Sequence, residues 1–269
     1  MTQQERTRAF HALHQDGLLI LPNSWDAGSA RIIEEAGAKA IATSSAALAW
    51  AHGYPDGEAL PVATLVAAVR EIVRAVRVPV SADIEAGFAA DASSAGDFVV
   101  RMLEAGAVGV NIEDGQESPD LLCAKIERIR HVAAGKGVDL WINARIDVYL
   151  RKLAEGDAAY DETIARARRY ADAGANSIFV PGAAEETLIA KFVRDLALPL
   201  NVLAWPGLPD AAKLKAIGVR RLSAGAGLAR ASLGFTRSVA ETFLRDGRSQ
   251  PFGEGPHANM SINALMQRD

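Results

Sequence analysis

Two carboxylates lie close together in the sequence at the point where an apolar segment ends. In the stretch SADIEAGF, residues 81–88, Asp83 and Glu85 follow the apolar run Val78-Pro79-Val80. Two like charges at the end of a strand cost free energy unless a positive group lies between them. A divalent cation or a basic side chain would supply that charge, so the pair is a candidate binding site.

Two further acidic side chains are expected near this pair. Asp56 lies in the loop YPDGE, and Glu113 ends the strand-like segment GVNIE. Together with Asp83 and Glu85 they offer only oxygen ligands, which suit Mg²⁺ or Mn²⁺ and argue against zinc. Because Mg²⁺ keeps several of its waters, some of these carboxylates would act through water.

Arg145, in the segment INARID, is the arginine expected at a strand end. Its planar guanidinium matches the geometry of a carboxylate. Ser44 and Ser45 end another expected strand, and this position favours contact with the same ligand. A cation and a guanidinium in one pocket predict a site for a small di- or polyanion.

Structural roles would explain some of the same residues. Asp83 and Glu85 could pair with Arg145 in a network that only stabilises the fold. Asp56 could be a turn residue, and Ser44 could cap a helix. The sequence leaves these alternatives open.

A repeated pattern indicates the elements that position these side chains. The segments EEAGAKAIATSS (34–45), LEAGAVGVNIED (103–114) and ADAGANSIFVPG (171–182) each run from a helix end through Gly into a β-rich stretch. Gly ends a helix because it adopts the left-handed conformation easily. The expected strands lie near residues 18–22, 39–44, 78–83, 107–113, 139–145, 176–180, 199–203 and 219–223.

Helical patterns fill nearly every gap between these strands, which implies a parallel sheet with right-handed crossovers. Eight such units favour an α/β (β/α)₈ barrel over a doubly wound open sheet. We expect one domain over residues 1–269, with an N-terminal helix at about 3–15 and a C-terminal tail at about 247–269. Such a tail either frays or packs on a partner subunit.

The composition is that of an ordinary globular protein. The chain has 269 residues, is 49% hydrophobic and carries a formal net charge of −4, which argues against electrostatic binding to nucleic acid. No apolar run is long enough to span a membrane, and none at the start is typical of a signal peptide. A single cysteine, Cys123, excludes an internal disulfide, so a cytoplasmic location is expected.

The motifs SARIIEEAG, DIEAGF, NIEDG and INARID, with the Ser44-Ser45 strand end, resemble the isocitrate lyase/phosphoenolpyruvate mutase superfamily over about residues 18–245. The resemblance implies a (β/α)₈ TIM barrel whose eighth helix swaps onto a neighbouring subunit, in a homo-oligomer that is a dimer or a homotetramer. It also implies Mg²⁺ and a 2-oxo acid or enolate bound at the metal.

The resemblance assigns roles residue by residue. Asp83 matches the direct metal ligand within the substrate site, and Glu85, Glu113 and Asp56 match acidic residues that hold the water around the metal. Arg145 matches the arginine that contacts a substrate carboxylate or phosphonate. The substrate carboxylate would bind the loop Ser44, Ser45 and Ala46. Arg145 and Glu113 are the expected catalytic residues, with Glu113 a candidate base.

The sequence also departs from the family pattern. Lyases of the superfamily carry a Lys-Lys-Cys-Gly-His-like segment after the fourth strand, whereas this chain has GQESPD there. Cys123 lies beyond that loop, in helical sequence, and is not assigned the lyase role. The long gating loop of the phosphonate mutases and hydrolases is missing too, and Pro181 stands where mutases have a histidine.

These features predict a Mg²⁺-dependent enzyme that cleaves a carbon–carbon bond in a small 2-oxo or 2-hydroxy di- or tricarboxylate through an enolate. It would be a lyase or resemble an oxaloacetate decarboxylase, because loss of CO₂ requires least from a gating loop. One alternative is a phosphonate-processing mutase or phosphonopyruvate hydrolase. Another is a protein that binds 2-oxo acids without turnover.

Overall fold

A computed structural model of the chain describes residues 1–254 and 260–267. Within them, parallel strands form one nine-stranded sheet in the order β1-β9-β8-β7-β6-β5-β4-β3-β2. The strands are β1 (Leu19–Leu21), β2 (Asn23–Ser24), β3 (Ile41–Thr43), β4 (Val80–Asp83), β5 (Gly109–Glu113), β6 (Trp141–Arg145), β7 (Ser177–Phe179), β8 (Leu200–Leu203) and β9 (Arg221–Ser223).

The two edge strands of this sheet, β1 and β2, are consecutive in the chain and are separated only by Pro22. β1 pairs with β9 and β2 pairs with β3, so the first strand joins both ends of the sheet. Proline has no N–H to donate, which explains the interruption. The sheet therefore closes into the expected (β/α)₈ barrel, with the strand expected at 18–22 present as β1.

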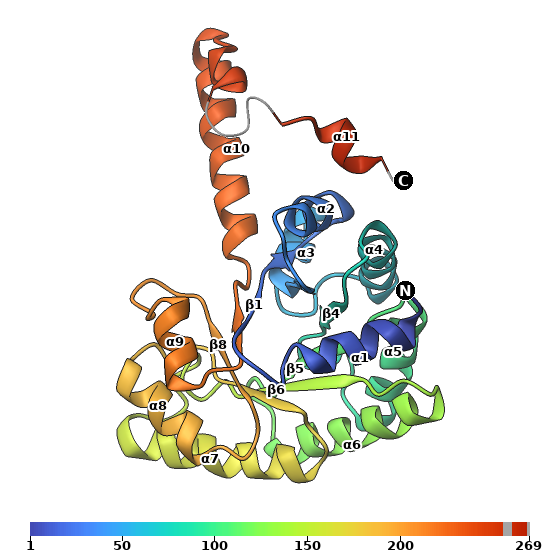
Figure 1. Cartoon of the computed structure of the whole chain (residues 1–269), viewed down its shortest axis with the longest axis vertical. Helices are drawn as coiled ribbons and strands as arrows, with labels where there is room; N and C mark the ends of the chain where they lie inside the picture. Colours follow the sequence, from blue (N-terminus) through green and yellow to red (C-terminus); the bar gives the residue numbers. More distant parts are fainter. Residues whose placement is uncertain (255–259, 268–269) are drawn as a thin grey trace.

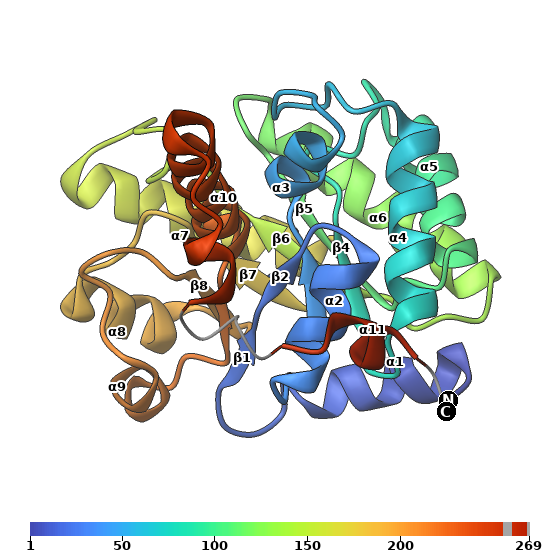
Figure 2. The same cartoon turned by 90° about the horizontal axis from the view of Figure 1, so that it is seen from above.

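Helices surround the strands, as Figures 1 and 2 show. They are α1 (Gln3–Ala12), α2 (Ala27–Glu35), α3 (Ser45–Ala51), α4 (Val62–Ala75), α5 (Ala92–Glu104), α6 (Pro119–Gly135), α7 (Gly156–Asp172), α8 (Glu186–Asp195), α9 (Ala211–Ile217), α10 (Gly227–Asp246), the 3₁₀ helix η1 (Gln250–Gly253) and α11 (Ile262–Met266). In the described part of the chain, none of these helices combines the length and apolar character needed to cross a membrane.

The repeated Ala-Gly-Ala segments form the turns that they predict. Gly37, Gly106 and Gly174 follow α2, α5 and α7 with φ values of 99°, 97° and 107°. Only glycine adopts this left-handed region without strain, so each helix ends there and the next strand begins a few residues later.

Apolar side chains fill the space between the strands and their helices, and a second apolar cluster closes the end of the barrel where the strands begin. In that cluster Phe10 of α1 packs with Leu19, Leu21 and Trp141. His14 stacks on Trp141, with ring centroids 4.0 Å apart. Polar side chains line the opposite end of the barrel, where the strands end.

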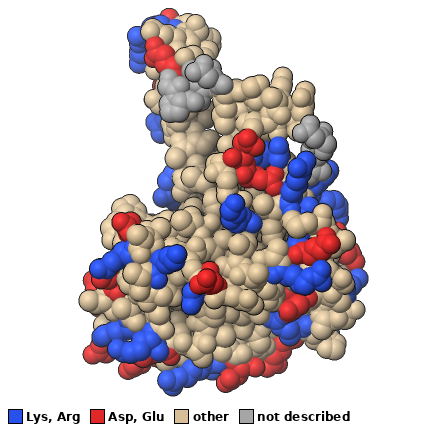
Figure 3. Space-filling view, in the orientation of Figure 1, with Lys and Arg blue, Asp and Glu red and all other residues tan. Residues whose placement is uncertain are grey.

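The last long helix, α10, projects away from the barrel (Figure 1). Its side chains Leu228, Leu233 and Leu244 are 42%, 50% and 84% exposed. Of the expected tail, η1 and α11 are described, and α11 lies against α2 because Arg31 Nη2 donates to the Leu265 carbonyl oxygen at 2.9 Å. Over the view in Figure 3, basic and acidic side chains are interspersed across the barrel.

The tight barrel interior gives the first prediction. A Cβ at Gly109 of β5 would lie 2.8 Å from Phe10 Cε1 and 3.1 Å from Ser81 Oγ. Gly109→Ala should therefore lower the free energy of unfolding by about 1–3 kcal/mol, the usual effect of overpacking. Urea denaturation followed by circular dichroism measures this change.

Gly135→Ala is the matched control, because a Cβ there meets no atom within 4 Å. Its free energy of unfolding should stay equal or rise slightly, since Ala is the better helix former. Equal denaturation midpoints for the two variants would contradict the close packing at Gly109.

Candidate active site

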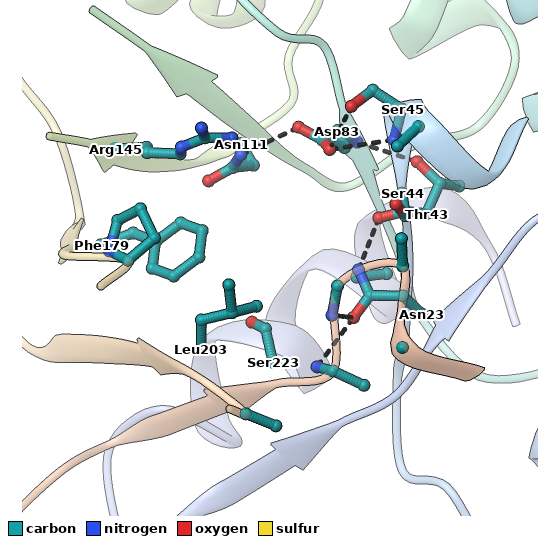
Figure 4. Close-up of a pocket in the computed structure, with 18 of the residues that line it drawn as sticks. Asn23, Thr43, Ser44, Ser45, Asp83, Asn111, Arg145, Phe179, Leu203 and Ser223 are labelled. Atoms are coloured by element: carbon teal, nitrogen blue, oxygen red, sulfur yellow. Dashed lines mark hydrogen bonds between the residues drawn. The ribbon is translucent and has the colours of Figure 1, made fainter. Parts of the chain in front are cut away.

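A pocket of about 450 Å³ opens at the end of the barrel where the strands end. Its wall contains Ser45, Asp83, Asn111, Arg145 and Ser223, which come from five different strands or the segments that follow them. In Figure 4 Asp83 and Arg145 lie on the same side of this pocket, next to Asn111. The parallel strands thus bring together residues that are far apart in the sequence.

Asp83 is held at a fixed position by three hydrogen bonds to its carboxylate. Oδ2 accepts from the backbone N–H and the hydroxyl of Ser45 at 3.0 and 2.9 Å. Oδ1 accepts from Asn111 Nδ2 at 2.9 Å. Each carboxylate oxygen has more than one acceptor site, so the carboxylate can also bind a cation.

A chain of hydrogen bonds along the barrel wall fixes the orientation of the Asn111 amide. Asn143 Nδ2 donates to Asn111 Oδ1 at 2.9 Å, so Asn111 must present Nδ2 to Asp83. Ser177 Oγ in turn donates to Asn143 Oδ1 at 2.6 Å, and Trp141 Nε1 donates to Ser177 Oγ at 2.9 Å. The donor beside Asp83 is therefore set by buried residues of β5, β6 and β7.

Two carboxylates position Arg145. Its Nε and Nη2 donate to Asp147 Oδ1 and Oδ2 at 2.6 and 3.0 Å, and Nη1 forms an ion pair of 2.5 Å with Glu113 Oε2. Burial lowers the pKa of Arg145, but Glu113 and Asp147 outweigh it, so the pKa is raised and the guanidinium stays charged. Asp147 also accepts from Arg151 Nε at 2.9 Å, and its N–H donates to Asp114 Oδ1 at 2.9 Å.

Glu85 and Glu113 are buried, with 6% and 8% of their surface exposed, and neither belongs to the pocket wall. Burial, and then the Asp83 charge, raise the pKa of Glu85 to about 7. Burial raises the pKa of Glu113 to about 8, against the lowering effect of Arg145. A cation beside Asp83 would favour the ionised form of both carboxyls.

The loop around Glu85 is strained and tightly bonded. Glu58, Glu85 and Phe88 have φ values of 58°, 48° and 50°. Glu58 N donates to Glu85 Oε2 and Phe88 N donates to Glu58 Oε1, both at 2.7 Å, while Lys125 Nζ donates to the Ala86 carbonyl oxygen at 2.8 Å. Backbone strain of this kind persists only where the surrounding contacts fix it, and it is common at functional sites.

The oxygen-only donor set fits Mg²⁺ rather than a softer metal. Within residues 1–254 and 260–267, no three His, Cys, Asp or Glu side chains are grouped so that they alone could hold a metal ion. The geometry therefore suits one direct ligand, Asp83, with the other carboxylates acting through water.

The structure brings most of the predicted site residues to the pocket and places two behind it. Asp56, in an exposed loop, lines the wall together with Ser44, Ser45 and Ala46. Ser44 also caps α3, since its Oγ accepts from Ala47 N at 3.4 Å. Glu113 contacts Arg145 rather than the open pocket.

Sequence reasoning missed Arg221, which lines the pocket and is only 3% exposed. The signal for it was the alternation along β9. Ser223 faces the barrel interior, so the residue two positions before it faces inward as well.

Comparisons with known proteins agree on one family. The family model for phosphoenolpyruvate phosphomutase matches residues 10–244. An uncharacterized protein of Mycobacterium tuberculosis is 34% identical over 256 residues, which cover 91% of this chain and 94% of that protein. A crystal structure from Burkholderia cenocepacia J2315, provisionally described as a lyase/mutase, is 34% identical with a TM-score of 0.89 and covers 99% of this chain and 97% of that one.

A relative with a named activity is more distant. The oxaloacetate decarboxylase of Pseudomonas aeruginosa is 29% identical over 209 residues, which cover 73% of this chain and 70% of that enzyme.

The raised pKa values of Glu85 and Glu113 predict how stability depends on pH. Both carboxyls bind protons more tightly in the folded chain than at their ordinary pKa of 4.5. Without a metal, stability should therefore fall as the pH rises from about 4.5 through about 8, by on the order of 3 kcal/mol for Glu85 alone. Urea denaturation in EDTA at several pH values measures this slope.

Glu85→Gln removes one of these titrating groups and should flatten the curve. Glu127→Gln, at an exposed position of α6, should leave it unchanged. If the free energy of unfolding of Glu85→Gln depends on pH as that of the wild type does, the Glu85 carboxyl does not titrate between about pH 4.5 and 8.

Proposed function

Because the chain belongs to the phosphoenolpyruvate phosphomutase family, as its motifs predict, we propose that it is a Mg²⁺-dependent enzyme that cleaves a carbon–carbon bond. Its substrate would be a small 2-oxo or 2-hydroxy di- or tricarboxylate, and the reaction that of a lyase or an oxaloacetate decarboxylase. The observation that carries this proposal is the placement of Asp83 and Arg145 on the wall of one pocket. One residue suits a hard cation, and the other suits a carboxylate.

Arg145 and the Ser44–Ala46 loop would bind the carboxylate next to the 2-oxo group. Asp147 holds the guanidinium through Nε and Nη2, so Arg145 has little freedom to turn away from the pocket. A side chain that is already fixed loses little entropy when the substrate binds. The ligand would thus be oriented with its reactive end toward Asp83.

Bound Mg²⁺ would polarise the 2-oxo group and stabilise the negative charge that develops there when the bond to C3 breaks. Asp83 would hold the ion, and the protonation states of Glu85 and Glu113 would adjust to it. Burial raises the pKa of Glu113, whereas the paired guanidinium of Arg145 lowers it. Glu113 is a candidate to exchange a proton with C3, through water rather than by direct contact.

The loop after β5 favours cleavage without an elaborate gate. It consists of residues 114–118, and its Glu117 pairs with the buried Lys125 at 3.1 Å. In decarboxylation the bond between C3 and C4 breaks, CO₂ leaves, the electron pair forms the enolate and C3 then takes up a proton. These reaction steps need no general base, which agrees with the short loop and with the decarboxylase among the relatives.

We also infer a homo-oligomer in the cytoplasm, where a single thiol such as Cys123 stays reduced. An apolar groove of about 680 Å³ lies beside β1 and α2, and its lining includes Ile20, which is 54% exposed. The helix α10 projects from the barrel, and its side chains Leu233 and Leu244 are 50% and 84% exposed. The α10 helix of a second copy is the occupant that we propose for the groove.

Asp83→Asn tests the proposed metal site. The variant keeps the size of the side chain but loses its charge, so Mg²⁺-dependent turnover should fall by about a hundredfold or more. The assay follows loss of oxaloacetate, 2-methylisocitrate and phosphonopyruvate at neutral pH, with Mg²⁺ or with EDTA. Asp97→Asn, whose side chain is 78% exposed, is the matched control and should retain full activity.

The other outcomes of this assay identify the alternatives. Phosphate released from phosphonopyruvate would identify a phosphonopyruvate hydrolase, and phosphoenolpyruvate formed from it would identify a mutase. Binding of oxalate that needs Mg²⁺ and Asp83, with no turnover of any substrate, would identify a non-catalytic 2-oxo acid binder. Turnover that does not depend on Asp83 would contradict the proposed site.

Leu233→Glu tests the proposed assembly, because it places a charge on the exposed apolar side of α10. The molar mass measured by light scattering after size-exclusion chromatography should fall toward that of the monomer. Ala134→Glu, at an exposed position of α6, is the control and should leave the mass unchanged. A wild-type mass of 28.5 kDa would rule out the oligomer.

A further inference from the structure

The floor of the pocket contains a buried arginine without a carboxylate partner. Arg221 is 3% exposed, and its Nε donates to Ser223 Oγ at 3.2 Å. Its Nη1 is buried with no hydrogen-bond partner, and in the described part of the chain no carboxylate lies within ion-pair distance of the guanidinium. A buried charge left in this state costs several kcal/mol unless a ligand compensates it.

Two other buried side chains each have a polar atom without a hydrogen-bond partner. Asn201 lies opposite Arg221 in the pairing of β8 with β9, and its Oδ1 accepts from Ser223 Oγ at 3.0 Å. That bond fixes the amide, and its Nδ2 remains an unused buried donor. Ser81 of β4, which lines the pocket with Arg221, has a buried hydroxyl without a partner. The pocket wall thus offers the Arg221 guanidinium and the Ser81 hydroxyl, and the Asn201 amide lies behind the wall on the strand next to Arg221.

Among the residues that the structure describes, the apolar cluster below these groups contains no carboxylate that could neutralise Arg221. This end of the barrel is closed by Phe10, Trp141 and His14, and His14 Nδ1 bonds the Phe10 carbonyl oxygen at 2.9 Å. Burial, and then the charge of Arg221, lower the pKa of His14 to about 3, so that its ring is neutral. Asp83, above the floor, interacts with Arg221 through space but belongs to the proposed metal site.

We propose that Ser81, Asn201 and Arg221 form a carboxylate subsite at the pocket floor, which binds the substrate carboxylate remote from Arg145. The inference rests on the proposed function, since it assigns the second anionic group of the same substrate. A carboxylate there would accept hydrogen bonds from Arg221 Nη1 and the Ser81 hydroxyl, which otherwise lack partners. A monocarboxylate would leave Arg221 buried and uncompensated, so the floor selects dicarboxylates.

The subsite also distinguishes the two reactions within the proposed function. A cation at the floor stabilises a carboxylate that keeps its charge, whereas loss of CO₂ removes that charge. The carboxylate bound by Arg221 is therefore one that remains in the product. This favours cleavage between two carbons of a longer di- or tricarboxylate over decarboxylation of a four-carbon substrate bound at both ends.

Binding of matched 2-oxo acids tests the subsite. Isothermal titration calorimetry with Mg²⁺ compares 2-oxoglutarate with 2-oxopentanoate, and 2-oxoadipate with 2-oxohexanoate, which differ only in the second carboxylate. In the wild type at least one dicarboxylate should bind about tenfold more tightly than the monocarboxylate of the same chain length, because the monocarboxylate leaves donors at the floor unpaired. In Arg221→Met this ratio should fall to near one, while oxalate binding stays within about threefold of the wild type.

A second variant covers the case in which Arg221→Met does not fold. Asn201→Asp places a carboxylate beside Arg221 and neutralises it, so the preference for dicarboxylates should be lost here too. Thermal denaturation confirms that each variant is folded before it is titrated. A dicarboxylate ratio near one in the wild type at both chain lengths, or an unchanged ratio in both variants, would overturn the subsite.

Two further measurements distinguish a failure of the proposed subsite from a failure of the proposed function. The first measurement adds sodium nitrate and follows the melting temperature. If nitrate raises it only when Arg221 is present, and no preference for dicarboxylates is found, the floor binds an inorganic anion and the substrate role is overturned. Oxalate binding that needs neither Mg²⁺ nor Asp83 would instead contradict the proposed function, whatever the dicarboxylate ratio.

Discussion

Charge balance among the buried side chains at the barrel mouth is the constraint on which the candidate site depends. Each buried charge there must find a partner, because water cannot screen it. Arg145 meets this condition with Glu113 and Asp147. Two places do not meet it, the acidic cluster at Asp83 and the positive floor at Arg221. The charge is negative at the first place and positive at the second. A cation bound at Asp83 and an anion bound at Arg221 would balance both.

The parallel register of the strands makes this arrangement. Asp83 pairs with Asn111, Asn111 with Asn143, and Glu113 with Arg145 across neighbouring strands. Side chains at paired positions point the same way, so each polar residue has its bonding partner on the next strand. The network in Figure 4 is therefore a consequence of the barrel, and a shift of register would separate Asp83 from the Asn111 amide that helps hold it.

The sequence was sufficient for the barrel because each unit carries local signals. The Ala-Gly-Ala turns marked helix ends, and the residues after each apolar run marked strand ends, which included Asp83 and Arg145. It could not show that Pro22 divides the first strand, since that depends on pairing with both β9 and β3. The sequence also could not show how deep in the barrel each side chain lies. Glu113 lies behind the pocket wall because Arg145 stands before it, and Arg221 is notable only because its buried Nη1 has no hydrogen-bond partner.

The start of α10 links the pocket to the proposed assembly. Gly225, Gly227 and Arg230 line the pocket, and Arg230 lies over the Trp50 ring, 5.8 Å from its centroid. If a second copy binds α10, the same contact fixes the pocket wall at Gly227. The substrate would then meet a complete site only in the oligomer, because one rigid helix joins the two.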